Sequence, residues 1–110
     1  IMVILFHRDD KYFMILGGLS MITRQIRVWG RVQGVGFRFF TQQLAIQLDL
    51  CGTVQNKMDG SVFAVAQGEE KAVTRFMERV KASTSPYGRV DRYEESEVCD
   101  TPLYTKFQII

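Results

Sequence analysis

The sequence has few residues of the kinds that usually bind metals. Its 110 residues include two cysteines and one histidine. Cys51 and Cys99 lack the close spacing of metal ligands, and His7 alone cannot complete a Cys/His set, so the usual zinc constellations are excluded. Reduced thiols in a cytoplasmic protein are the favoured interpretation. A disulfide is the minority alternative, because the sequence does not show whether the two Cα atoms lie within bonding range.

The chain also lacks a charge excess and a long apolar run. Fourteen basic and twelve acidic residues give a net charge of +2 (Lys+Arg 14, Asp+Glu 12), too balanced to indicate wholesale binding of nucleic acid or a membrane surface. Charged residues separate the apolar runs 1–6 and 13–19, and neither run approaches the roughly 20 residues of a membrane span. We therefore expect neither nucleic acid nor membrane as a partner. The length and composition predict one small globular domain with a modest core.

Residues 1–20 differ from the rest of the chain. A secretory signal peptide would place its charges before its apolar stretch and end in small residues, and this segment does neither. Met21 lies directly before the first regularly patterned strand. We expect residues 1–20 to be an N-terminal extension or a consequence of start-site choice, and residues 21–110 to form the domain. A native N-terminal strand or interaction tail is the alternative.

From Arg24 onward, strand and helix patterns alternate clearly. Apolar residues at helical spacing predict one helix from Phe37 and a second that opens at Glu69 and Glu70. Asp59-Gly60 is typical of a hairpin turn. Alternation with a period of two predicts strands over residues 24–32, 51–56, 61–67 and 89–94, with a further edge strand over 104–110.

This order, β-α-β-β-α-β, predicts an α+β fold of the ferredoxin-like kind. Its features would be an antiparallel sheet of four to five strands with both helices packed on one face. Right-handed crossovers limit the topology to a small set. The fold does not choose a function by itself, since enzymes, metal carriers and RNA-binding modules share it.

The most informative segment runs from Val28 to Arg38. It begins as a strand, turns through Gly34 and Gly36, and ends with an arginine at the start of a helix. Such a loop places free backbone N–H groups around one point, and the helix dipole adds partial positive charge there. The forked guanidinium of Arg38 fits phosphate oxygens bidentately. The segment therefore predicts a site for a phosphate-sized dianion.

The same segment resembles a known family. Residues 30–38, Gly-Arg-Val-Gln-Gly-Val-Gly-Phe-Arg, are similar to the signature loop of the acylphosphatases, and Gly52-Thr53-Val54-Gln55-Asn56 followed by Asp59-Gly60 is a second match. The resemblance extends in order over residues 24–110. It implies a small enzyme that hydrolyses the carboxyl-phosphate bond of acyl phosphates to carboxylate and inorganic phosphate, without metal or cofactor. We expect this enzyme to be a cytoplasmic monomer.

The resemblance also implies residue roles. Arg38 would bind the phosphate, Asn56 would orient the attacking water, and the phosphate cradle would consist of Gln33, Gly34, Val35, Gly36, Phe37 and Arg38. The chemistry agrees with these roles, because an acyl phosphate already has a stable carboxylate as its leaving group and needs positioning more than a strong nucleophile. An asparagine amide can aim a water but cannot deprotonate it, so we expect the substrate phosphate to act as the base.

The alternative is a non-catalytic ferredoxin-like module that binds RNA or a phosphoryl ligand. Gly34 to Phe40 superficially resembles the glycine-aromatic stretch of RNA-recognition domains, but here the phenylalanines follow helical spacing instead of lying on a central strand. A domain that keeps the loop but has lost turnover is the other form of this alternative. RNA titration compared with phosphate release from an acyl phosphate distinguishes them.

Three positions depart from the family pattern. Asp49 and Ser85 stand where glycine is frequent, and Thr53 stands where a large aromatic residue is frequent. If Asp49 must adopt the left-handed conformation, a cost of about 1 kcal/mol is expected. On the outward face of the first strand, Arg27, Trp29 and Arg31 are interpreted as a solvated surface rather than a rim of the substrate site.

Overall fold

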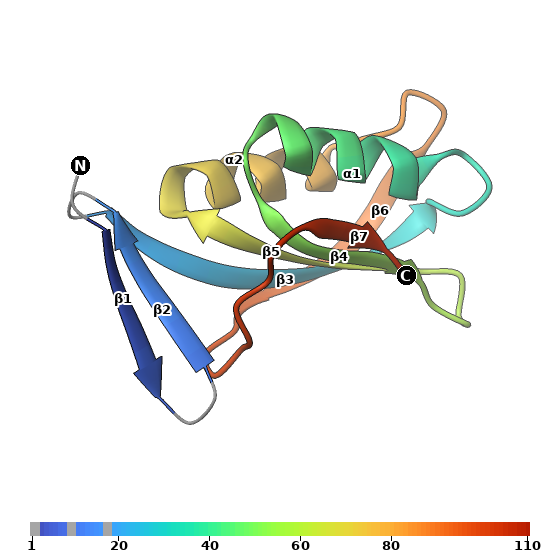
Figure 1. The fold of residues 1–110 in the computed structure, drawn as a ribbon. Coiled ribbons are helices and arrows are strands. Elements are labelled where there is room, and N and C mark those ends of the chain that lie inside the picture. Colours follow the sequence, from blue (N-terminus) through green and yellow to red (C-terminus); the bar gives the residue numbers. More distant parts are fainter. Residues whose placement is uncertain (1–2, 9–10, 17–18) are drawn as a thin grey trace.

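The computed structural model describes residues 3–8, 11–16 and 19–110, and the side chains of residues 21–110. The elements follow one another along the chain as shown in Figure 1. They are β1 (Val3–Arg8), β2 (Lys11–Leu16), β3 (Leu19–Arg31), α1 (Phe37–Gln47), β4 (Cys51–Asn56), β5 (Val62–Glu69), α2 (Glu70–Lys81), β6 (Arg89–Glu97) and β7 (Phe107–Ile109).

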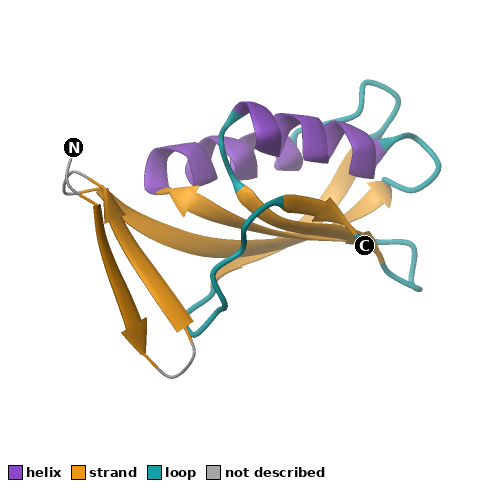
Figure 2. Cartoon of the chain, viewed as in Figure 1, coloured by secondary structure: helices purple, strands orange, loops and turns teal. Residues whose placement is uncertain are grey.

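The central part of the sheet has the order β6-β3-β5-β4-β7, and both helices cover one of its faces (Figure 2). Strand β3 pairs antiparallel with β5 and β6, and β4 pairs antiparallel with β5. The ferredoxin-like α+β prediction is confirmed. One strand differs from the expected antiparallel sheet, because β7 pairs parallel to β4. After β6 the chain turns back and crosses to the opposite edge, so β7 runs against β6 and therefore along β4.

The core lies between the helices and the inner face of the sheet. In α2 the apolar residues recur at helical spacing, and Val73, Phe76, Met77 and Val80 are buried. Helix α1 contributes Phe37, Leu44 and Ala45, which meet alternate residues of the strands. The opposing strand residues include Ile26, Val28, Val54, Val62, Ala64 and Phe107. This packing fixes the start of α1 against the sheet.

Strands β1 and β2 form an antiparallel hairpin at the end of the sheet away from the β3–α1 loop (Figure 1). The hairpin joins β3 through the pairs Ile15↔Ser20 and Leu16↔Leu19, so β3 begins earlier than the predicted strand. The domain boundary between residues 20 and 21 stays a prediction. Among the described residues, no helix has the length and apolar character needed to cross a membrane.

Candidate functional site

The loop between β3 and α1 makes a tight turn that depends on two glycines. Gly34 and Gly36 both have φ of 76°, in the left-handed region that side chains with a Cβ adopt at a cost. A Cβ at Gly34 would meet nothing within 4 Å, so the backbone angle, and not crowding, favours glycine there. The strand–loop–helix order predicted for this segment is present in the structure.

Helix α1 begins without a side-chain cap. Gly36 occupies the N-cap position, and the first helical bond runs from the N–H of Phe40 to the carbonyl of Gly36 at 3.0 Å. The backbone N–H groups of Phe37, Arg38 and Phe39 precede that bond and have no partner within the helix. The first turn contains no acidic residue, and it carries the Arg38 cation. This helix start is suited to an anion.

A pocket of about 250 Å³ opens at this helix start. It brings together Gly34, Gly36, Phe37 and Arg38 with Asn56, the last residue of β4. The Oδ1 atom of Asn56 is buried and has no hydrogen-bond partner among the described residues, although buried acceptors are normally satisfied. The pocket therefore brings a helix start suited to an anion beside Asn56, whose Oδ1 lacks a donor among the described residues. Its other lining residues are Val32, Phe39 and Ile109.

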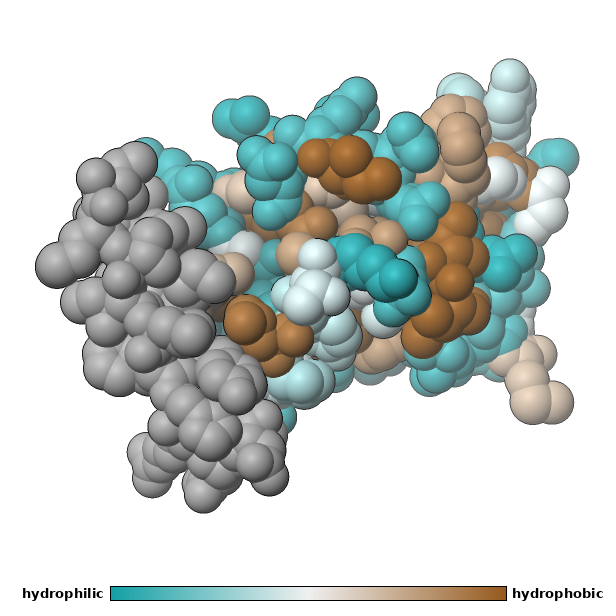
Figure 3. All heavy atoms as spheres, viewed as in Figure 1, coloured by the Kyte–Doolittle hydropathy of each residue, from teal (hydrophilic) through white to brown (hydrophobic). Residues whose placement is uncertain are grey.

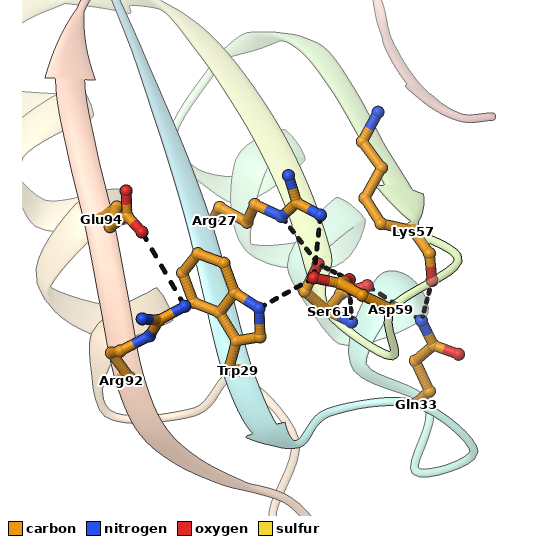
Figure 4. Close-up of polar contacts among 8 residues, drawn as sticks. All are labelled: Arg27, Trp29, Gln33, Lys57, Asp59, Ser61, Arg92 and Glu94. Atoms are coloured by element: carbon orange, nitrogen blue, oxygen red, sulfur yellow. Dashed lines mark hydrogen bonds and ion pairs between the residues drawn. The ribbon is translucent and has the colours of Figure 1, made fainter.

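Two of the six predicted cradle residues, Gln33 and Val35, do not line the pocket. Gln33 does not line the pocket, and its amide nitrogen donates to the carbonyls of Lys57 at 2.8 Å and Ser61 at 2.9 Å (Figure 4). Val35 is buried in the core, and its carbonyl accepts a hydrogen bond from the Ser85 hydroxyl at 2.6 Å. These contacts anchor the loop from two sides. A contribution of the two backbone N–H groups to phosphate binding stays a prediction.

Ser85 is a residue whose contribution was missed in the sequence, where it stood only as a departure from glycine. Its side chain is 2% exposed, and its hydroxyl also accepts a hydrogen bond from the N–H of Tyr87 at 3.1 Å. The serine thus connects the β3–α1 loop to the turn before β6. No local signal indicates this, because its partner Val35 lies far away along the chain.

The β4–β5 hairpin faces the same loop and has a well-defined turn. The N–H of Lys57 donates to the carbonyl of Ser61 at 2.8 Å, and Gly60 has φ of 91°. Asp59 Oδ1 accepts hydrogen bonds from the N–H of Ser61 at 3.0 Å and from its hydroxyl at 2.5 Å. The predicted Asp-Gly hairpin turn is confirmed, and Asp59 closes it as an Asx turn.

The second carboxylate oxygen of Asp59 binds two side chains of β3. Trp29 donates its indole N–H to Oδ2 at 3.0 Å, and Arg27 forms an ion pair with it at 3.0 Å (Figure 4). The hydrogen bonds from Ser61, followed by those from Trp29 and Arg27, hold the pKa of Asp59 well below its usual range. Arg27 and Trp29 therefore contact the hairpin while their side chains stay partly exposed, and Arg31 is exposed, as expected for a strand face turned to solvent.

Comparison with known proteins decides the family. Residues 24–109 match the acylphosphatase family model. The chain belongs to the acylphosphatase family. It is 47% identical over 88 residues to the acylphosphatase of Lacticaseibacillus paracasei, a match that covers 80% of this chain and 95% of that relative. It is 46% identical over 90 residues to the acylphosphatase of Lactobacillus gasseri, covering 82% of this chain and 99% of the relative.

The fold agrees with this assignment. The crystal structure of the acylphosphatase from Bacillus subtilis superposes with a TM-score of 0.77 at 39% identity, covering 81% of this chain and 98% of that one. The acylphosphatase from Coxiella burnetii gives the same TM-score of 0.77 at 29% identity. The family resemblance stated from the signature loop is confirmed, and it favours the enzyme over the non-catalytic alternatives.

Proposed function

We propose that this acylphosphatase hydrolyses the carboxyl-phosphate bond of small acyl phosphates in the pocket between the start of α1 and the end of β4. One observation supports this location above all. The residues of the first helical turn, Arg38 among them, line the same pocket as Asn56, whose Oδ1 has no hydrogen-bond partner among the described residues. The reaction needs an anion site and a positioned water, and these groups fit both.

The phosphate half of the site comprises the loop and Arg38. Backbone N–H groups near Gly34 and Gly36 and the guanidinium of Arg38 would bind the oxygens of the phosphoryl group. Because they are fixed before the substrate arrives, they stabilise the charge that develops on those oxygens without reorganisation. Each such donor contributes on the order of 2.7–4 kcal/mol, by analogy with oxyanion holes.

The water half is Asn56. Its Oδ1 would accept a hydrogen bond from the attacking water and hold that water near the phosphorus, on the side opposite the carboxylate leaving group. A new P–O bond forms to the water oxygen as the P–O bond to the acyl group breaks, and the bonding electrons leave with the carboxylate. The proton of the water passes to a phosphate oxygen, so the pocket needs no separate base.

The remaining wall of the pocket would contact the acyl group. Phe39 and Ile109 line it, with 54% and 40% of their surface exposed. Figure 3 shows several separate hydrophobic patches on this face, one of them on the side away from the grey atoms. Such surface can cover the carbon skeleton of a small acyl phosphate.

Within this proposal, the acyl phosphate is the partner of the chain, and neither nucleic acid nor membrane is required. The enzyme acts as a monomer in the cytoplasm and uses no metal or cofactor, and residues 21–110 form its working domain. The charge balance of the chain supports the absence of a nucleic-acid or membrane partner, and the small size of the pocket supports a small substrate.

The decisive experiment follows the disappearance of benzoyl phosphate in the presence of EDTA. We expect Arg38→Ala to lose both turnover and inhibition by inorganic phosphate, because it removes the cation of the anion site. Asn56→Ala should lose turnover and keep phosphate inhibition. The control is Arg79→Ala, which removes an exposed arginine from the last turn of α2. Near-wild-type turnover of Asn56→Ala would contradict the role assigned to the amide.

A further inference from the structure

We propose that Gln33 is a positioning residue: its side-chain amide, held by a hairpin whose shape Asp59 fixes, sets the phosphate loop relative to Asn56. This inference rests on the proposed function. It assigns Gln33 a role through its side chain, separate from the predicted cradle role of its backbone. The role can be separated experimentally from phosphate binding.

The first connection is the amide of Gln33. Its Nε2 carries two hydrogens, and it donates to the carbonyls of Lys57 at 2.8 Å and Ser61 at 2.9 Å. Gln33 directly precedes Gly34 of the phosphate loop, and Lys57 directly follows Asn56. The amide thus joins the residue next to the phosphate half of the site to the residue next to the water half.

The second connection keeps the two carbonyls in place. Besides the Lys57–Ser61 backbone bond, the N–H of Gly60 donates to the carbonyl of Lys57 at 3.2 Å. Asp59 Oδ1 binds both the N–H and the hydroxyl of Ser61. The carbonyls of Lys57 and Ser61, which both accept from Gln33 Nε2, therefore lie in a turn whose shape is fixed by the Asp59 carboxylate.

The third connection returns to β3. Arg27 binds Asp59 through its ion pair and donates to the Ser61 hydroxyl at 2.8 Å, while Trp29 donates to Asp59. The guanidinium carbon of Arg92 lies 3.9 Å from the centroid of the Trp29 ring (Figure 4). Because β3 leads into the phosphate loop, strand, loop, amide and hairpin form a closed ring. The loop and the end of β4 cannot then shift independently.

Closure of this ring matters for rate more than for affinity. In the proposed site phosphate would contact Arg38 and the backbone N–H groups, whereas both donor hydrogens of the Gln33 side chain point at the hairpin carbonyls. A water held about 1 Å out of line can cost on the order of a hundredfold in rate. Loss of the amide should therefore misalign water and phosphorus while phosphate still binds.

The test is Gln33→Met, which keeps the length of the side chain and removes both donors. We expect kcat for benzoyl phosphate to fall about ten- to a hundredfold. The inhibition constant of inorganic phosphate should stay within about threefold, because the groups that bind phosphate remain. Gln47→Met is the matched control, since Gln47 is exposed at the opposite end of α1. Circular dichroism establishes that each variant is folded.

Asp59→Asn tests the hairpin separately. An asparagine can still accept from Ser61 through Oδ1, but its NH2 group would face the donors of Trp29 and Arg27. We expect a smaller fall in kcat than for Gln33→Met. In the double variant the two effects should combine to less than their product, because both act on the same connection. Asp91→Asn, which removes another exposed carboxylate paired with an arginine, is the control.

Several results would overturn the inference. A folded Gln33→Met with wild-type kcat would do so, as would a loss of phosphate inhibition in proportion to kcat, which would make Gln33 a phosphate-binding residue instead. Fully multiplicative effects of the two substitutions would also contradict it. If Gln33→Met does not fold, Asp59→Asn with wild-type kcat overturns it. A wild-type chain that releases no phosphate from benzoyl phosphate would refute the proposed function itself.

Discussion

Asp49 shows how a single residue can carry a conformational cost. It follows α1 with φ of 55°, where the left-handed conformation lets the N–H of Leu50 return to the carbonyl of Ala45 at 2.9 Å. We expect Asp49→Gly to raise the free energy of unfolding by about 1 kcal/mol, because glycine adopts this conformation without the Cβ clash. Urea denaturation monitors the change. A lower unfolding midpoint would contradict it, and turnover should be unaltered.

Other contributions of single residues could not be read from the sequence. The conformation of Asp49 was predictable, because the position just after a helix commonly requires a left-handed residue. The hydroxyl of Ser85 binds the carbonyl of Val35, which lies 50 residues away along the chain. The amide of Gln33 binds the carbonyl of Ser61, which lies 28 residues away. Such contacts depend on how distant segments of the chain pack together. A local sequence pattern therefore identifies the residue but does not predict its hydrogen-bond partner.

At the scale of elements, β4 depends on a glycine where it lies against β5. Gly52 has φ of 144°, and a Cβ there would overlap the carbonyl oxygen of Val65. We expect Gly52→Ala to destabilise the protein by about 2 kcal/mol or more, because the backbone of β4 must move away from β5. Urea denaturation is the measurement. A loss below about 0.5 kcal/mol would show that the strand adapts without strain.

The elements themselves were largely predictable, and their relative placement only in part. The β3–α1 loop, the start of α1 and the position of Asn56 were predicted from short motifs, and in the structure residues of all three line one pocket. The direction of β7 could not be predicted. A strand of three residues at the edge of a sheet has no sequence pattern that indicates which strand it pairs with or in which direction. The contact of Asp59 with Trp29 requires the register of β3 against β5, which the sequence pattern leaves open.

At the scale of the whole molecule, the N-terminal hairpin is the part least tied to the site. Among the described residues it pairs with β3 at Ile15↔Ser20 and Leu16↔Leu19, and the family match begins only at residue 24. The described core draws on residues from Ile26 to Phe107. We expect a chain of residues 21–110 to keep its melting temperature within about 3 °C, a difference below about 1 kcal/mol. Its kcat/KM for benzoyl phosphate should match that of the full chain. An unfolded or inactive shortened chain would place the domain boundary elsewhere.

The uncapped start of α1 has a consequence for the energetics of the whole protein. If inorganic phosphate binds at this helix start, as we propose, it completes a helix that lacks its own side-chain cap, and the product of the reaction then stabilises the enzyme that made it. Folding and phosphate concentration are then linked: each tenfold rise of inorganic phosphate above its dissociation constant adds about 1.4 kcal/mol to the free energy of unfolding. The free energy of unfolding measured for this protein would therefore depend on the phosphate concentration of the buffer.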